Sequence, residues 1–430
     1  MNNVDKQYLD LLQDILDNGT YKKTRAGYVK SVFGRMLKFN LKEGFPILTT
    51  KKVFTKGIIH ELLWFLKGET NIKYLVDNNV HIWDDDAYRH YINMVKKHNE
   101  LVIERDSLRE SETCFEYYFD KVDEKHTDIN PYGFEYIPDM DNIYYDVECG
   151  HVEYKTYEVS ETCLFGRTIK EIIPLTKEEF LKCVIEEDYV SLLKEYDGYA
   201  FVINDYRYGD LGLVYGYQWR KQGEVQNIEK GEYPIDQIQN IIDMLKSNPD
   251  DRRMICMAWN AMDFAKMALP PCHYGFQVYT RELTPTERLE WLWEHSNGEY
   301  DEWKSPTKSS LDDLGVPTRE LSLMWQQRSV DTFLGLGFNI TSYSLLLCML
   351  AQCVNMTVGE VTCSLGDCHI YEAHFDAVKE QLTRDPFKYK LPKLVLTKEV
   401  NDIDEFTFDD IKIEEYESYP TIKAPLCVGL

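Results

Sequence analysis

The sequence lacks three features, and each absence narrows the class of protein. It has no run of 18 apolar residues, so hydropathy predicts no membrane-spanning helix. It has no C-x-x-C motif, and its 11 cysteines are an odd number that cannot pair completely, so we expect reduced thiols. Basic residues are few, 48 against 73 acidic ones, and the net charge of −25 disfavours nucleic acid and acidic membranes as partners.

The length and the first residues add two further limits. A chain of 430 residues can bury one large core or two ordinary ones. Its first stretch is MNNVDKQYLDLLQDILDNG, in which acidic residues interrupt the apolar positions, a pattern typical of neither a signal peptide nor a transit peptide. We therefore expect a cytoplasmic protein.

The apolar pattern predicts an α+β domain with no internal repeats. Helical spacing is present in residues 9–16 and 235–247, and residues 340–356 are almost wholly apolar, which is typical of a core helix. Enrichment in β-branched and aromatic residues predicts a pair of strands in 29–41 and a further strand in 254–259. Such a mixture favours a sheet covered by helices.

Two stretches interrupt this pattern. Residues 91–204 combine many tyrosines with many acids, and we interpret them as a small β-rich lobe inserted into a main domain of residues 1–90 and 205–430. Near its end, residues 174–196 have a helical pattern that begins with a capping box. Residues 281–319 form a smaller polar insertion. The large lobe is expected to be a solvated surface element, with partner binding or regulation as the alternative.

Two residues attract attention as reactive groups. Glu61 lies in the segment KGIIHELLWFLKGET, which is apolar on nearly every face of the predicted helix, so its carboxyl group should be buried. Cys272 lies between a proline pair and His273 at the start of a predicted strand. A lone cysteine in such a place is more often a packing residue than a nucleophile. A nucleophilic thiol needs a nearby cation or hydrogen-bond donor and access to its substrate.

Arginines next to turn signals or strand ends could supply that cation. A guanidinium group binds phosphate through two hydrogen bonds, and several of them together would lower the pKa of a neighbouring thiol. Most arginines in such places are instead solvated or paired in salt bridges, and this alternative stays open. The arginines concerned are Arg25, Arg252, Arg253 and Arg328.

Seven segments together resemble the folate-dependent thymidylate synthase family. They are PDDRRMICMAWN, ALPPCHYGFQVY, QQRSVDTFLGLGFNITSYSLLL, GDCHIYEAH, VYGYQWR, HELLWFLKGETNIKYLVDNNVHIWDDDA and FGRMLKFNLKEGFPILTTKK. The resemblance covers nearly the whole chain outside the two insertions. It implies the thymidylate synthase fold, in which a large mixed β-sheet is packed with helices and forms a homodimer through the sheet.

The resemblance also implies a role for each matching residue. The expected catalytic residues are Cys272 as nucleophile, Glu61 as general acid and base, and Tyr215, His273 and Asn339 in the polar network around the reacting base. The expected nucleotide-binding residues are Arg25, Arg328, Ser329, Asn339, His369 and Tyr371, with Arg252 and Arg253 supplied by the second subunit. The expected folate-binding residues are Asp331, Trp83, Ile82 and Lys51.

The implied reaction converts deoxyuridylate (dUMP) and 5,10-methylenetetrahydrofolate to thymidylate (dTMP) and dihydrofolate. A thiolate that adds to C6 of the pyrimidine turns C5 into a nucleophilic carbon, which attacks the one-carbon unit of the folate. The proton transfers need a carboxyl group with a pKa raised by burial, which suits Glu61. The folate itself supplies the hydride, so we expect neither a metal nor a nicotinamide.

Two other functions stay open at this point. Capture of the methylene intermediate by water would make the protein a pyrimidine hydroxymethylase. The amide of Asn339 suits uracil, whereas deoxycytidylate hydroxymethylases carry aspartate there, and Trp83 would shield the intermediate. Both residues favour thymidylate synthesis, but a uracil-specific hydroxymethylase would also keep Asn339. A non-catalytic nucleotide-binding homologue is the second alternative, and the intact set of reactive residues disfavours it.

Two places depart from the family pattern. Arg25 lies in KKTRAGYVKS, where most members have Arg-Thr-Gly. The last residues, IKAPLCVGL, differ from the usual C-terminal segment, which closes over the folate and excludes water. The other cysteines of the C-terminal half are loosely spaced and predict packing instead of a zinc site. These are Cys348, Cys353, Cys363 and Cys368.

Overall fold

The computed structural model describes residues 3–24, 26–110, 143–145, 152–154, 171–196, 200–223, 234–301, 306 and 310–427. The chain divides into two compact units, one of residues 1–87 with 209–430 and one of residues 88–208. The sequence pattern places the corresponding limits at 90 and 205. Each unit is described by itself.

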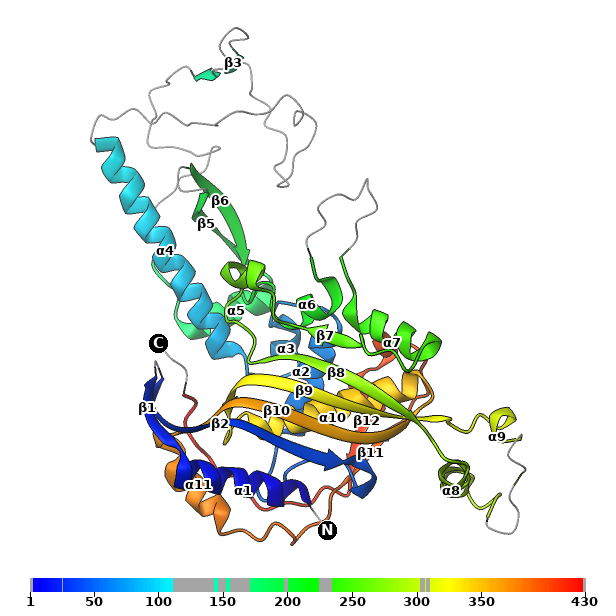
Figure 1. Ribbon diagram of the computed structural model, residues 1–430. Helices are drawn as coiled ribbons and strands as arrows, with labels where there is room; N and C mark the ends of the chain where they lie inside the picture. Colours follow the sequence, from blue (N-terminus) through cyan, green and yellow to red (C-terminus); the bar gives the residue numbers. More distant parts are fainter. Residues whose placement is uncertain are drawn as a thin grey trace. The chain divides into compact units, whose positions relative to one another are not determined.

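A six-stranded sheet forms the frame of the larger unit (Figure 1). The strands follow the order β1-β2-β10-β9-β8-β7, in which β9 and β10 are parallel and every other neighbouring pair is antiparallel. The predicted mixed sheet of an α+β protein is therefore confirmed. The strands are β1 Thr20–Thr24, β2 Gly27–Asn40, β7 Ile255–Met257, β8 His273–Glu282, β9 Arg319–Asp331 and β10 Thr357–Tyr371.

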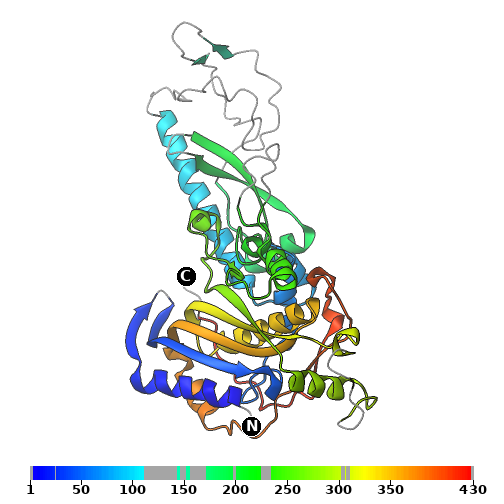
Figure 2. The same cartoon turned by 45° about the vertical axis from the view of Figure 1, so that its right-hand side comes forward.

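Helices pack against this sheet and against one another. Helix α10 packs on β9 and β10, α2 packs on α10, and α1 packs on β2 and β10. Figures 1 and 2 show α10 running along the sheet and α1 beside α11. The helices are α1 Asn3–Asn18, α2 Thr55–Leu66, α3 Lys73–Asp77, α6 Gly216–Lys221, α7 Gln237–Ser247, α10 Leu336–Cys353 and α11 Phe375–Leu382, and a two-stranded sheet joins β11 Lys393–Leu396 to β12 Ile411–Glu414.

Helix α10 is the core helix that the apolar pattern predicts. Almost all of its side chains are buried, including Leu346, Leu347 and Leu350. Among the described residues it is the one helix long and apolar enough to cross a membrane, but 78% of it lies buried inside the protein, as in the core helix of a soluble protein.

Strand β2 corrects the expected pair of strands in residues 29–41. The chain continues as one strand of 14 residues, and its partner in the neighbouring hairpin is β1. Within this strand Gly34 adopts a φ of +72°, which other residues rarely adopt. The strand goes on pairing with β10 on both sides of this residue.

The smaller unit contains helices and hairpins. Helix α4 extends over Asp84–Glu110, α5 over Lys177–Glu186, and the hairpins pair β3 Ile143–Tyr145 with β4 Val152–Tyr154 and β5 Tyr189–Tyr196 with β6 Ala200–Arg207. Tyr91 packs against Phe180 at a ring distance of 5.3 Å. Most of residues 111–170, on which the expectation of a β-rich lobe depends, lie outside the described residues.

The helix predicted over residues 174–196 is only partly confirmed. The capping box is present, because Thr176 accepts from the backbone of Glu179 and the Glu179 side chain accepts from Thr176. The helix ends at Glu186, and Glu187 follows in the left-handed region with φ of 60°. Residues Tyr189–Tyr196 form β5, because they pair along their whole length with β6.

Residues 283–318 contain two short helices, α8 Pro285–His295 and α9 Ser310–Asp313. A small apolar cluster of Leu292, Leu311 and Val316 joins them. This segment connects β8 to β9 at the end of the sheet opposite Cys272.

Candidate active site

Three strand ends bring predicted site residues to one edge of the sheet. Cys272 directly precedes β8, and its carbonyl oxygen accepts from the backbone N–H of Arg328 at 2.9 Å. Because β9 and β10 run parallel, the end of β9 lies beside the end of β10, and Asp331 pairs with His369. The start of β8 and the ends of β9 and β10 therefore coincide, and this register places the three segments together.

Cys272 is fixed from two sides. Its backbone N–H donates to the Tyr215 hydroxyl at 2.8 Å. Arg328 crosses the loop before it, donating from Nε to the carbonyl of Pro271 and from Nη2 to that of Pro270, both at 2.8 Å. Burial raises the pKa of the Cys272 thiol, while the Arg328 charge and the Tyr215 hydroxyl act in the opposite direction. The residue is partly accessible, so a ligand can reach it.

A buried polar pair lies behind the cysteine. The ring of His273 lies 4.5 Å from that of Tyr215, and its Nδ1 is 2.8 Å from the hydroxyl of Tyr343. Burial lowers the pKa of His273 to about 3, so the imidazole is neutral at physiological pH. Tyr215 itself has a φ of 25°, a strained conformation held by its buried surroundings.

Glu61 joins this group from α2. Its Oε1 accepts from Nε1 of Trp83 at 2.8 Å, and the Trp83 ring lies 5.9 Å from that of Tyr215. Burial raises the pKa of the Glu61 carboxyl to about 7, although the hydrogen bond from Trp83 acts in the opposite direction. A carboxyl group with a pKa near neutral pH is suited to donate and accept protons.

The turn between β9 and α10 carries two more predicted residues. Oδ1 of Asp331 accepts from the backbone N–H groups of Phe333 and Leu334, at 3.1 and 3.0 Å. These bonds shape the turn that leads into α10, where Asn339 lies in the first turn and is partly exposed. Asp331 and Asn339 thus have positions fixed by backbone hydrogen bonds.

His369 and Tyr371 are neighbours at the end of β10. Their rings meet edge to face, with centroids 5.2 Å apart. Nδ1 of His369 lies 3.2 Å from the backbone carbonyl of Asp367, and because a carbonyl oxygen only accepts, Nδ1 carries the proton. Burial, with a contribution from the Asp331 charge, raises the pKa of Tyr371 to about 12, so its hydroxyl stays protonated.

Lys51 and Ile82 differ in environment. Nζ of Lys51 donates to the carbonyl oxygen of Phe333 and lies 3.8 Å from the centre of the Phe333 ring. Burial lowers the pKa of Lys51 to about 7, with the Asp331 charge opposing this change. Ile82 is partly exposed in the turn before α4, next to Trp83. Lys51 therefore lies on the Asp331 side of the site and Ile82 on the Glu61 side.

Comparison with known proteins identifies the family of this chain. A family model described as thymidylate synthase matches residues 6–428. The chain belongs to the thymidylate synthase family. It is 35% identical over 425 residues to the thymidylate synthase of Mycoplasma mobile, covering 98% of this chain and 100% of that protein. The thymidylate synthase of Leuconostoc mesenteroides is 35% identical over 429 residues, covering 100% of both chains. That of Listeria monocytogenes serotype 4b is 34% identical over 428 residues, covering 98% and 100%.

The resemblance to the thymidylate synthase family is therefore confirmed over nearly the whole chain. Thymidylate synthases are methyltransferases that use 5,10-methylenetetrahydrofolate as co-substrate. Among the described residues no three His, Cys, Asp or Glu side chains are grouped as metal ligands. That the enzyme needs no metal stays a prediction.

Two of the predicted arginines, Arg252 and Arg253, do not join Cys272 within one chain. Arg25 lies outside the described residues. Arg252 and Arg253 precede β7, where the carbonyl of Arg252 accepts from Gln277 on β8 at 3.4 Å. Gln277 is five residues along β8 from Cys272, which at about 3.3 Å per residue is roughly 17 Å. Arg253 is exposed and is bonded to Asp251 at 2.5 Å.

Sequence reasoning missed one polar residue of the group behind Cys272, namely Tyr343. Tyr343 was expected only to fill the core, yet its hydroxyl bonds to His273, and its ring stacks on Trp325 at 5.0 Å. The available signal is helical spacing, because Tyr343 follows Asn339 by four residues and so lies on the same face of α10.

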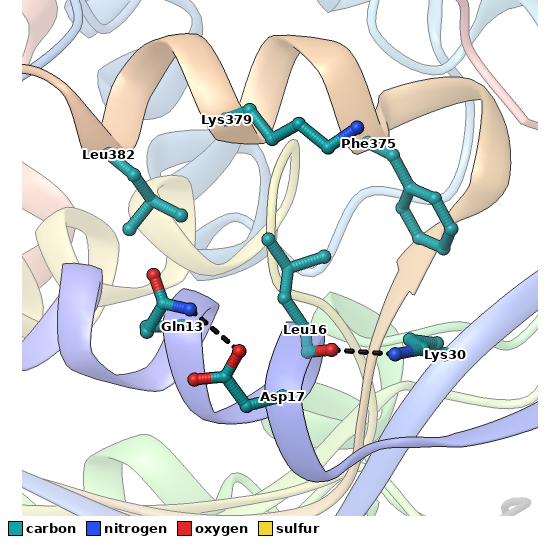
Figure 3. Close-up of a pocket in the computed structure, with 7 residues that line it drawn as sticks. All are labelled: Gln13, Leu16, Asp17, Lys30, Phe375, Lys379 and Leu382. Carbon is teal, nitrogen blue, oxygen red and sulfur yellow. Dashed lines mark hydrogen bonds between the residues drawn. The ribbon is translucent and has the colours of Figure 1, made fainter.

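A separate surface pocket of about 510 Å³ lies between α1 and α11 (Figure 3). In this pocket Lys30 donates to the carbonyl oxygen of Leu16 at 2.6 Å, and Gln13 donates to Asp17 at 2.8 Å. None of the residues that line it belongs to the predicted site. Its lining residues are Gln13, Leu16, Asp17, Lys30, Phe375, Lys379 and Leu382.

Proposed function

We propose that this protein converts dUMP and 5,10-methylenetetrahydrofolate to dTMP and dihydrofolate through a covalent bond between Cys272 and C6 of the pyrimidine. The observation that carries the proposal is the position of Cys272, a partly accessible thiol at a strand start, between the Arg328 guanidinium and the Tyr215 hydroxyl. A cysteine that only filled the core would need neither a cation nor access.

The first step of the proposed reaction forms the bond between sulfur and C6. Because burial raises the pKa of Cys272, the resting thiol is protonated near neutral pH and loses its proton as it adds to the ring. The electron pair moves to C5 and O4, which makes C5 a nucleophile toward the one-carbon unit of the folate. The positive charge of Arg328 favours this step because it stabilises the thiolate.

Glu61 is the proposed general acid and base. Its pKa of about 7 lets it exchange protons with groups of the pyrimidine and the folate near neutral pH. The neutral pair of His273 and Tyr343 supports the other side of the site, where an ionised imidazole would be costly. We assign to Tyr215, His273 and Tyr343 the role of a neutral polar network around the base.

Asn339 is the proposed reader of the base. Its amide oxygen accepts a hydrogen bond and its amide nitrogen donates one, which complements N3–H and O4 of uracil. Cytosine presents an acceptor at N3 and a donor at C4, so the same amide would have to turn over to bind it. Uracil is therefore the proposed base, and the fate of its methylene intermediate separates a synthase from a hydroxymethylase.

Ligand binding divides between two groups of residues. For the nucleotide phosphate we propose Arg328, which is exposed and whose Nη1 has no hydrogen-bond partner within the described part of the chain, together with Ser329 and Arg25. For the deoxyribose we propose His369 and Tyr371. For the folate we propose Asp331, Trp83, Ile82 and Lys51.

A homodimer would complete the proposed phosphate site. Three large apolar side chains on strands of the sheet are exposed in the single chain, namely Phe33 at 81%, Met36 at 63% and Tyr279 at 67%. Large apolar side chains exposed on the surface of one chain are typical of a face that another protein chain covers. Arg252 and Arg253 lie too far from Cys272 of their own chain to share its phosphate, whereas a second copy on this face could receive them.

Product analysis tests the proposal. The protein is incubated with 5,10-methylenetetrahydrofolate and either dUMP or deoxycytidylate, and nucleotides and folates are identified by mass spectrometry. We expect dTMP and dihydrofolate from dUMP. Hydroxymethylated nucleotide with tetrahydrofolate would indicate a hydroxymethylase, and nucleotide binding without product would indicate a binding protein.

The covalent bond is tested separately with 5-fluorodeoxyuridylate. Cys272→Ser should abolish the adduct, whereas Cys348→Ser should retain it, because burial raises the pKa of Cys348 to about 12 and makes that thiol unreactive. An adduct that survives in Cys272→Ser would show that another residue attacks the ring.

A further inference from the structure

The described C-terminal segment, residues 416–427, is held to the larger unit at several points. The Tyr416 hydroxyl donates to the carbonyl of Leu48 at 2.7 Å, and the backbone N–H of Tyr419 donates to that of Thr49 at 2.8 Å. Further along, Nη1 of Arg384 donates to the carbonyl of Pro420 at 2.7 Å. These contacts lead the segment along residues 48–53 toward the predicted site.

The contact nearest the end of the described segment is made by His374. Its Nε2 lies 2.8 Å from the carbonyl oxygen of Pro425 and 3.5 Å from Sγ of Cys427. Because a carbonyl oxygen only accepts, Nε2 carries a proton and donates. His374 ends the 3₁₀ helix η5 Glu372–His374, directly after β10, so a rigid element of the sheet supports this donor.

The His374 ring also contacts both ligand-binding groups of the proposed site. It lies 5.5 Å from the ring of Tyr371, edge to face, and 5.5 Å from the ring of Phe333. The backbone N–H of Phe333 donates to Asp331. The ring therefore packs between a proposed nucleotide contact and the turn of a proposed folate contact.

Burying His374 costs free energy, and its hydrogen bond to Pro425 helps to explain why a histidine occupies this position. The residue is 0% exposed, and its Nδ1 has no hydrogen-bond partner among the described residues. A buried polar atom without a partner is unfavourable, so a purely apolar side chain would pack here with less loss. The property that an apolar side chain lacks is the donor directed at Pro425.

The end of the segment lies within electrostatic reach of the site. Burial raises the pKa of the Cys427 thiol, and the Asp331 charge raises it further. Cys427 in turn contributes to the raised pKa of Tyr371. The segment that His374 holds is therefore near the residues that we assign to the folate and the deoxyribose.

We propose that His374 is a positioning residue whose Nε2–H bond to Pro425 holds the C-terminal segment against the catalytic edge and thereby limits water at the methylene intermediate. The inference rests on the proposed function. When hydride from the folate adds to the exocyclic methylene, the sulfur–C6 bond breaks and dTMP and dihydrofolate form. When water adds instead, its oxygen bonds to the methylene, its proton goes to the released thiolate, and 5-hydroxymethyl nucleotide and tetrahydrofolate form.

Two variants at His374 separate the donor from the ring. His374→Phe keeps a flat ring and loses the donor, whereas His374→Gln keeps a distal N–H that can reach Pro425. His60→Gln is the matched control, because His60 is also a buried histidine with one hydrogen-bonded nitrogen, at 3.0 Å from the Tyr74 hydroxyl. Its ring contacts are with Tyr74 and Phe408, both outside the segment 416–427.

The first measurement needs no catalysis. Trypsin can cut after Lys423, an exposed residue in the segment. The rate of this cleavage reports how often the segment 416–427 detaches from the larger unit. One net hydrogen bond corresponds to about two- to tenfold in such an equilibrium. We expect His374→Phe to raise the cleavage rate by that factor, and His374→Gln and His60→Gln to stay near the original protein.

The second measurement follows the reaction. We expect His374→Phe to raise the KM for the folate and the fraction of 5-hydroxymethyl product by a similar factor, while the dissociation constant for dUMP stays within about twofold. His374→Gln should restore both values. Unchanged cleavage and product ratio in His374→Phe would overturn the inference, as would equal impairment in Phe and Gln variants. If the original protein makes no dTMP, the proposed function fails, and the trypsin rates still decide whether His374 holds the segment.

Discussion

Replacing Glu61 by Gln should remove activity and yet stabilise the protein above neutral pH. Burial raises the pKa of the Glu61 carboxyl from an ordinary 4.5 to about 7. A difference of about 2.5 pH units corresponds to roughly 3 kcal/mol in the free energy of unfolding. Glutamine has the same shape and its amide oxygen can still accept from Trp83, so the substitution changes little besides the charge.

The direction of the pH dependence follows from proton binding. In the unfolded chain Glu61 loses its proton near pH 4.5, whereas in the folded protein it keeps it until about pH 7. Between these values the folded state binds more protons, so stability falls as the pH rises. The contribution is fully present below pH 4.5 and is lost above pH 7. Glutamine does not ionise, so its variant avoids this loss.

Urea unfolding at one fixed protein concentration measures the effect. We expect Glu61→Gln and the original protein to differ little at pH 5, and Glu61→Gln to be more stable by about 3 kcal/mol at pH 8.5. Glu69→Gln, at an exposed position shortly after α2, should show no such pH-dependent gain. Equal stability of Glu61→Gln and the original protein at pH 8.5 would refute a raised pKa at Glu61, and with it the assignment of Glu61 as acid and base.

Two further predictions concern selectivity and reactivity. Asn339→Asp should shift the ratio of kcat/KM from dUMP toward deoxycytidylate, and an unchanged ratio would contradict the proposed contact with the base. In the original protein the positive charge of Arg328 stabilises the Cys272 thiolate. Arg328→Gln removes this charge and should move the pH midpoint for alkylation of Cys272 by iodoacetamide upward by about one unit or more. Arg281→Gln is the matched control and should leave that midpoint in place, since Arg281 lies at the far end of β8 and is bonded to Glu287 and Glu320.

Patterns among adjacent residues predicted the helices and strands whose first and last residues depend on their neighbours in the sequence. Helix α1 ends at Asn18, as the following glycine indicates. A Cβ at Gly19 would lie 2.3 Å from the carbonyl oxygen of Ile15, so only glycine permits this close approach. Helix α10 and the start of β8 at His273 were predictable for a similar reason, because continuous apolar character and a preceding proline pair are properties of adjacent residues.

Elements that depend on distant partners were not predictable in this way. The residues of β5, YVSLLKEY, fit a helical pattern, and their pairing with residues 200–207 decides for a strand. The composition of residues 29–41 predicts two strands, and pairing with β10 on both sides of Gly34 makes β2 one strand. In both cases the hydrogen bonds that select the conformation come from another segment.

The same division applies to the site. Motifs predicted a set of candidate site residues, but the contacts that set the environment of these residues join positions far apart in the sequence. Trp83 bonds to a carboxyl group 22 residues away, Arg328 to a carbonyl 58 residues away, and Tyr343 to His273, 70 residues away. Strand register and helix packing create these contacts, so a linear pattern could not specify them.

Burial gives the titratable groups of this site one property in common. It raises the pKa of Cys272 and Glu61 and lowers that of His273 and Lys51, so in each case it disfavours the charged form. Arg328 is the exception, because a guanidinium keeps its charge. A fixed cation beside groups that are nearly neutral attracts an anionic nucleotide into an otherwise acidic chain. Because Glu61 has a pKa near 7, the proton transfers that we propose for it would need little free energy. The cost of keeping Glu61 buried is the stability that Glu61→Gln should recover.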